Sequence, residues 1–147
     1  MSLNDRLNED MKQAMKNKDK LKLSVIRMVR SAIKNAEIES KSTLSDDEII
    51  TVLNRELKQR RDSLQEFKNA GREDLVEGLL AEIEILHQYL PEQLSEQELK
   101  DIIQSVINEV GATSKKDMGK VMGALIPKIN GRADGKLASQ LVQEYLN

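Results

Sequence analysis

Residues 120–136, KVMGALIPKINGRADGK, contain the residue types that bind phosphate. Lys128, Arg132 and Lys136 are cations on either side of Asp134, a residue type that commonly begins a helix as its N-cap. A helix start offers free backbone amides and partial positive charge, which together attract an anion. The amides after Asp134 and the three cations therefore form one candidate phosphate site. A plain turn between helices, with its cations facing solvent, is the alternative.

The glycines of this stretch suggest close approach of another chain to the backbone. Gly119 and Gly123 are four residues apart and share one helix face. Close packing of a neighbouring helix is the expected interpretation of the pair, and approach of a ligand strand guided by Lys120 is the second. Pro127 lacks an amide hydrogen, which predicts a kink or an end of the helix there. Gly131 is suited to a left-handed position just after a helix.

Further basic residues recur at helical spacing in the N-terminal part. They form two stripes: Arg27, Arg30 and Lys34 in one, and Arg55, Lys58 and Arg61 in the other. Acidic neighbours such as Glu56 and Asp62 favour a salt-bridged surface for these stripes. A second site for a polyanion is the alternative interpretation.

Residues for catalysis are scarce. His87 is the single histidine, and the chain has no cysteine. Glu84 and His87 form one Glu-x-x-His pair, whereas carboxylate di-metal sites need two such pairs and further glutamates. His87 is therefore expected at a helix surface. No GxxxxGK[ST] phosphate loop and no glycine-rich dinucleotide motif is present. The sequence predicts no catalytic residue, no metal site and no cofactor, and it favours a protein that is not an enzyme.

The charge is unevenly distributed along the 147 residues. The net charge is −2, yet residues 112–136 carry six basic and two acidic residues, whereas residues 71–111 carry two and ten. This asymmetry suggests a polyanion site in one part of the molecule. The polar N-terminus lacks the apolar core of a signal peptide, and no apolar run is long enough to span a membrane. A cytoplasmic location is the expectation.

Hydrophobic periodicity predicts helices almost throughout. We expect four helices, a joint at residues 91–95 that begins with Pro91, and three short helices. Capping boxes pair Ser45 with Glu48 and Ser95 with Glu98. The predicted domains are an N-terminal α-helical domain, residues 1–92, and a C-terminal helical domain, residues 93–147. The side chains expected to face inward include those of Leu75, Leu80 and Tyr145.

Several long stretches occur in the order that is typical of one protein family. They are MKNKDKLKLSVIRMVRSAIKNAEIE, RELKQRRDSLQEFKNAGREDLV, YLPEQLS and MGKVMGALIPKINGRADGKLASQLV. Along nearly its whole length the chain resembles the YqeY family. The resemblance implies an all-α fold with an N-terminal helical hairpin bundle and a C-terminal three-helix domain.

From about Ser95 onward the chain also resembles the GatB tail domain of the tRNA-dependent amidotransferases. The matching motifs are Gly119-Lys120-Val121-Met122 and Gly131-Arg132-Ala133-Asp134. The resemblance implies that this part helps to hold tRNA and does no chemistry. The ATP-dependent cradle domain of GatB is absent here. A label of carbon–nitrogen ligase with glutamine as amide donor would therefore be inherited from a relative.

These observations favour a non-catalytic tRNA-binding or translation-associated protein. A protein–protein adaptor for an amidotransferase or an aminoacyl-tRNA synthetase is the alternative, and a self-sufficient enzyme is a third class. The predicted RNA-binding residues are Gly119, Lys120, Gly123, Lys128, Gly131, Arg132, Asp134 and Lys136. The aromatic residues Phe67, Tyr89 and Tyr145 are expected in the core, so recognition should depend on backbone and shape.

Overall fold

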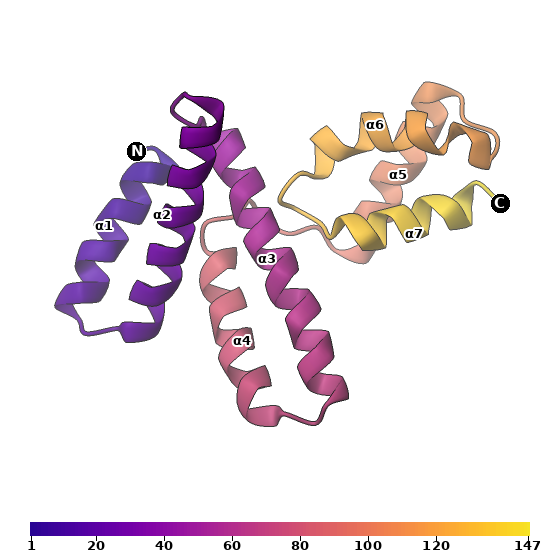
Figure 1. Ribbon diagram of the computed structural model, residues 1–147. Coiled ribbons are helices and arrows are strands. Elements are labelled where there is room, and N and C mark those ends of the chain that lie inside the picture. The colour runs from indigo at the N-terminus through magenta and orange to yellow at the C-terminus, as the bar shows by residue number, and fades with distance from the viewer. The chain divides into compact units, whose positions relative to one another are not determined.

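The computed structural model describes all 147 residues and is entirely helical (Figure 1). This confirms the predicted all-α class. The elements are α1 (Leu3–Lys16), α2 (Lys20–Ser40), α3 (Asp46–Asn69), α4 (Glu73–His87), α5 (Glu96–Val110), the 3₁₀ turn η1 (Lys115–Asp117), α6 (Met118–Ile129) and α7 (Gly135–Tyr145). They form two compact units, residues 1–90 and residues 91–147. None of the helices is both long and apolar enough to cross a membrane.

Serine side chains begin four of these segments in the same way. The hydroxyl oxygens of Ser2, Ser45, Ser95 and Ser114 each accept a backbone N–H from the first turn, and the acidic residue three positions later accepts the N–H of the serine. Such a box satisfies donors that have no partner inside the helix. The sequence predicts the boxes of Ser45 and Ser95, and Ser114 with Asp117 likewise has the spacing of a cap before α6, but the sequence does not single out the box of Ser2.

The first unit consists of two helical hairpins, α1–α2 and α3–α4, that share one core (Figure 1). The core is almost wholly aliphatic, and Leu7, Ile26, Leu53, Leu57 and Leu86 are completely buried. Aliphatic side chains at helical spacing suffice here because each helix presents one apolar stripe to the others.

Arg60 is a buried charge in this unit, with 5% of its surface exposed. Its guanidinium binds the carboxylate of Glu56, one turn earlier on α3, at 2.9 Å and that of Glu82 on α4 at 3.3 Å. It also donates to the backbone carbonyl of Glu56 and to the sulfur of Met28 on α2. The side chain therefore links three helices, and its charge is compensated by two partners.

Tyr89 follows α4 and holds it against α1. Its hydroxyl donates to the Asp10 carboxylate at 2.5 Å, and the Arg6 guanidinium lies 5.2 Å from the ring centre. Burial raises the pKa of the Tyr89 phenol, and the hydrogen bond to Asp10 adds to this effect. The neutral phenol is thus the form that the fold stabilises.

The second unit packs α5, α6 and α7 around its own aliphatic core. Its N-terminal segment is bound to the turn between α6 and α7. The amide of Leu94 donates to the carbonyl of Arg132 at 2.8 Å, and the side-chain amide of Gln93 donates to the carbonyl of Gly131 at 2.6 Å. The part of the expected joint from Gln93 onward is therefore integrated into this unit.

Three side chains predicted to face inward do not. Leu75 and Leu80 on α4 are 36% and 47% exposed, and Tyr145 at the end of α7 is 39% exposed. The apolar stripe of α4 is wider than the surface that α3 and α2 cover, and Tyr145 lies in the last turn of the chain's final helix. Tyr89 is buried as predicted, at 3% exposure, and Phe67 is half-buried.

We expect Arg60→Ala to lower the free energy of unfolding by about 2–3 kcal/mol, since the substitution leaves two glutamates without their shared cation. This loss of stability is smaller than that expected for a fully buried ion pair, because both glutamates keep some solvent contact. Urea denaturation followed by circular dichroism measures it. Arg72→Ala is the control, because the Arg72–Asp74 pair is exposed and its loss should cost no more than about 0.5 kcal/mol. Equal effects of the two substitutions would contradict this assignment.

The two-domain organisation stays a prediction that brief proteolysis checks. The exposed Glu92 lies outside any helix, next to Pro91, and its carbonyl accepts only a long hydrogen bond of 3.5 Å from Arg132, whereas Gln93 and Leu94 make shorter hydrogen bonds within the second unit. Limited digestion with a glutamate-specific protease should therefore first produce fragments 1–92 and 93–147, identified by mass spectrometry. First cuts within the helices, with Glu92 protected, would show that the joint is not accessible.

Candidate functional site

The outward side of α6 is built from small and apolar residues. Val121, Leu125 and Ile129 turn into the core. The opposite side, which we call the outer α6 face, is exposed and consists of Gly119, Lys120, Gly123, Ile126 and Pro127. The two sets follow from the helical period of 3.6 residues.

Nothing lies within 4 Å of the position where a Cβ atom would stand at Gly119 or Gly123. The expected interpretation, close packing of a neighbouring helix on these two glycines, is therefore wrong. The second interpretation, that the pair leaves room for a ligand strand, agrees with this geometry. Lys120 is exposed at the edge of the same face and forms no ion pair within 4.0 Å.

Of the two outcomes predicted for Pro127, a kink or an end of the helix, the structure excludes the end. The helix continues for two residues, to Ile129. Pro127 cannot donate to the carbonyl of Gly123, yet both residues lie on the exposed face, where a carbonyl can be satisfied by solvent. The absence of a side chain at Gly123 also leaves space around that carbonyl.

The turn after α6 has the predicted glycine conformation. Gly131 has a φ of +73°, in the left-handed region, and the amides of Arg132 and Ala133 both donate to the carbonyl of Ile129, at 2.8 and 3.3 Å. This pattern closes the C-terminus of the helix and reverses the chain.

Asp134 begins α7 as predicted, and by doing so it occupies the expected anion position. Its carboxylate accepts the amide of Lys136 at 3.1 Å. A phosphate at these amides would have to displace the carboxylate or lie beside a like charge. The phosphate position predicted from the sequence is therefore less favourable than the residue types suggest.

The structure does not bring the three predicted cations together at this turn. The ammonium of Lys128 binds Glu109 on α5 at 3.1 Å, and Nε of Arg132 donates to the carbonyl of Glu92 at 3.5 Å. Lys136 remains exposed and without an ion pair. Of the predicted RNA-binding residues, only Gly119, Lys120 and Gly123 share one open surface.

His87 is half-buried, contrary to the expected position at a helix surface. Its Nδ1 atom is buried and has no hydrogen-bond partner. Burial lowers the pKa of His87, and the nearby charge of Arg61 lowers it further, whereas Glu84 opposes the shift. No group of three or more histidine, cysteine, aspartate or glutamate side chains has an arrangement that fits a metal ion.

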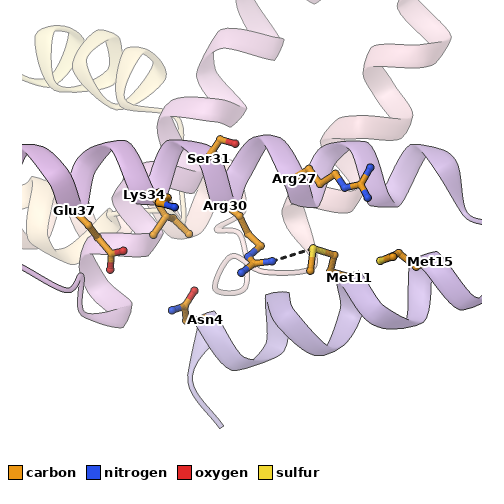
Figure 2. Close-up of a pocket in the computed structure, with 9 residues that line it drawn as sticks. Asn4, Met11, Met15, Arg27, Arg30, Ser31, Lys34 and Glu37 are labelled. Atoms are coloured by element: carbon orange, nitrogen blue, oxygen red, sulfur yellow. Dashed lines mark hydrogen bonds between the residues drawn. The ribbon is translucent and has the colours of Figure 1, made fainter.

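The basic stripe of α2 lines a groove between α1 and α2 (Figure 2). This α1/α2 groove has a volume of about 710 Å³ and is lined mainly by three cations and three apolar side chains: Arg27, Arg30, Lys34, Met11, Met15 and Ile33. The cations form no ion pair within 4.0 Å. The expected salt-bridged surface is wrong for this stripe, because the carboxylate of Glu56 binds Arg60.

The second basic stripe, on α3, is dispersed. Arg55 and Lys58 are exposed, and Arg61 is half-buried at a position where its charge acts on His87. None of the three forms an ion pair within 4.0 Å. The expected salt-bridged surface is therefore wrong for this stripe as well, and the stripe serves best as a control for charge effects.

Sequence reasoning missed two features. It did not single out Arg60, whose burial depends on acids on two helices. It also treated Met11 as part of the apolar face of α1 and did not predict that Arg30 would donate to its sulfur, at 3.0 Å. The signal available for Arg60 was its place as a polar residue at an apolar position of the α3 stripe. No sequence signal existed for the hydrogen bond between Arg30 and Met11.

Comparison with known proteins identifies the family of this fold. The sequence matches the family described as "Yqey-like protein" over residues 4–146. The chain belongs to the YqeY family. The match spans both units, so the family relationship covers the outer α6 face as well as the α1/α2 groove.

Three relatives share the name "Altered inheritance of mitochondria protein 41, mitochondrial". The protein from Pyrenophora tritici-repentis is 34% identical over 144 residues, which are 96% of this chain and 79% of the relative. That from Vanderwaltozyma polyspora is 31% identical, covering 96% and 80%. That from Clavispora lusitaniae is 35% identical, covering 84% and 72%. These relatives are named as mitochondrial proteins, which contradicts the cytoplasmic expectation.

We expect Gly123→Ala to raise the free energy of unfolding by about 0.5–1 kcal/mol, because alanine restricts the unfolded chain more than glycine and meets no neighbour here. Urea denaturation measures the change. Gly131→Ala is the contrasting variant and should destabilise by about 1–2 kcal/mol, since its φ of +73° disfavours a side chain. A loss of stability in Gly123→Ala would mean that something packs against this face.

Proposed function

We propose that this YqeY-family chain is a non-catalytic protein that binds the backbone of tRNA on the outer α6 face. The observation that carries the proposal is the pair of open glycines, Gly119 and Gly123, beside unpaired lysines. A glycine face lets a sugar–phosphate strand come closer to the helix than any side chain would allow.

The charges around this face support the proposal. Lys115, Lys116 and Lys120 are exposed and form no ion pair within 4.0 Å. They lie on η1 and on the first turn of α6, next to Gly119. Residues 112–136 have a local excess of positive charge although the whole chain is acidic, which favours attraction of a polyanion to this part of the surface.

The remaining predicted RNA-binding residues take different roles in this proposal. Lys136 is a free cation, and Lys128 must leave Glu109 before it can bind a phosphate. Only Nε of Arg132 donates to the Glu92 carbonyl, so its other guanidinium N–H groups could still bind a phosphate. Gly131 and Asp134 shape the turn and begin α7. They would therefore hold the structure and make no contact with RNA.

Recognition would depend on backbone and shape. Tyr145 is the only aromatic side chain that the structure exposes substantially, since Tyr89 is buried and Phe67 is half-buried. Stacking on bases would therefore contribute little. The resemblance of the C-terminal part to the GatB tail domain of the tRNA-dependent amidotransferases is consistent with a role in holding tRNA.

A protein–protein adaptor is the second candidate, and Ile126 favours it. This isoleucine lies on the outer α6 face and is 53% exposed. Together with Gly119 and Gly123 it gives the face an apolar centre, which suits a protein helix as well as a ribose. An amidotransferase or an aminoacyl-tRNA synthetase would be the partner in that case.

Binding of labelled tRNA between 50 and 200 mM salt, followed by fluorescence anisotropy, tests the proposal. The triple variant Lys115→Gln, Lys116→Gln and Lys120→Gln should bind more weakly. Its log–log salt slope should be shallower by about 2–3, at roughly 0.7–0.9 per lost phosphate contact. Neutralising Arg55, Lys58 and Arg61 is the matched control and should change the slope by less than about 1.

A variant that adds a side chain at Gly123 separates the effect of close approach by the RNA backbone from the effect of charge. Gly123→Gln should weaken tRNA binding about tenfold, which is about 1.4 kcal/mol, and leave the salt slope unchanged, because no cation is lost. Unchanged affinity and slope in both α6 variants, with circular dichroism showing that they are folded, would refute RNA binding here. Specific binding of a synthetase or an amidotransferase that Gly123→Gln abolishes, in the presence of ribonuclease, would instead establish the adaptor.

A further inference from the structure

The α1/α2 groove is long enough to bind one helix of about three turns. Its lining runs from Asn4 to Met15 along α1 and from Arg27 to Glu37 along α2. Each span covers about three helical turns, or about 15 Å at 1.5 Å per residue. Figure 2 shows Arg30 reaching from α2 across the groove toward Met11 on α1, with Arg27 and Lys34 on either side of it.

The cations of the groove lack partners within the chain. Glu37, the acid that lines the groove, accepts the amide of Leu44 at 3.0 Å and forms no ion pair with Lys34. Arg27 and Lys34 are exposed, and Arg30 is half-buried with its guanidinium against the sulfur of Met11. Three positive charges are thus held along one line without intramolecular compensation.

The floor between the cations is apolar. Met11 is half-buried, Met15 is 53% exposed, and Ile33 closes the bottom. Methionine side chains are flexible and polarisable, so they fit apolar groups of varied shape. The half-buried Met11 at the centre of the groove and the exposed Met15 at one end favour contact with an apolar partner.

We propose that the α1/α2 groove binds an acidic amphipathic helix of a protein partner. Apolar side chains of that helix, spaced at i, i+4 and i+7, would pack on Met11, Met15 and Ile33. Its carboxylates would bind Arg27 and Lys34, which lie toward opposite ends of the groove along α2. This is the helix-in-groove mode of recognition, in which an apolar stripe gives most of the contact and charges set the orientation.

Two other ligand classes fit less well. A phosphate backbone would satisfy the cations, but it has no apolar group to cover Met15. A small molecule is usually enclosed on most of its surface, whereas this groove is open along its length (Figure 2). An acidic amphipathic helix alone satisfies both the charges and the floor.

The test uses the full-length chain labelled with ¹³C in its methionine methyl groups and a synthetic helical peptide of about three to four turns. The peptide has leucine at i, i+4, i+7 and i+11 and glutamate at flanking positions. The methyl signals of Met11 and Met15 should shift on titration. Those of Met28, which contacts Arg60 on another face, and of Met122 should not.

Charge-reversal variants test whether the cations of the groove bind the carboxylates of the peptide. Arg27→Glu with Lys34→Glu should weaken binding of the acidic peptide at least about tenfold, whereas Lys58→Glu with Lys68→Glu, with the same change of net charge outside the groove, should change it less than about threefold. All four residues are exposed, so these substitutions should leave the fold intact. A peptide with lysine in place of each glutamate should not bind.

Three results would overturn the proposal. Equal binding of the acidic and the basic peptide would show a non-specific apolar contact. Stronger shifts of Met11 and Met15 by tRNA, with displacement of the peptide, would show a nucleic-acid site. Shifts that depend on protein concentration alone would show that a second copy fills the groove. Because the groove and the outer α6 face belong to different units, failure here leaves the tRNA proposal intact, and the reverse also holds.

Discussion

The constraint on which the rest of the structure depends is the satisfaction of free amides at helix starts. A serine hydroxyl and an acid three residues later fix the first turn in four segments of the chain. Once a helix start is fixed, the period of 3.6 residues decides which side chains enter the core. A shift of α6 by two residues would rotate it by about 200° and place Gly119 and Gly123 where Val121 and Leu125 now enter the core.

The second determinant is that several carboxylates of the first unit bind partners within the unit. Glu56 and Glu82 bind the buried Arg60, Asp10 accepts the phenol of Tyr89, and Glu37 accepts the amide of Leu44. These acids stabilise contacts between segments and are therefore not available to neighbouring surface cations. The uncompensated charge of the α1/α2 groove is the consequence of this internal arrangement.

The fold could be predicted from the sequence because its determinants are local. Apolar spacing, the serine boxes, the left-handed position of Gly131 and the capping by Asp134 all depend on residues a few positions apart. The same locality limits the prediction of the site. That Asp134 would occupy the amides it caps, and that Lys128 would bind Glu109, depends on side-chain geometry and tertiary packing.

The sequence did not decide whether α6 would end at Pro127 or continue through it. The rule that proline ends a helix assumes that the lost hydrogen bond is costly, and this cost falls where the freed carbonyl meets solvent. The exposed position of Gly123 and Pro127 results from the packing of Val121 and Leu125 into the core of the second unit. The spacing of these residues implies a shared face, but only the packing shows that nothing covers it.

The distribution of tyrosines gives the molecule two separate optical reporters. The chain has no tryptophan and two tyrosines, one in each unit. Tyr89 donates its hydroxyl to a carboxylate in a buried setting, whereas Tyr145 is partly in water. Their ultraviolet absorption and emission therefore respond to different surroundings. Replacing either by phenylalanine would leave a single chromophore that monitors one unit while the other unfolds or binds a ligand.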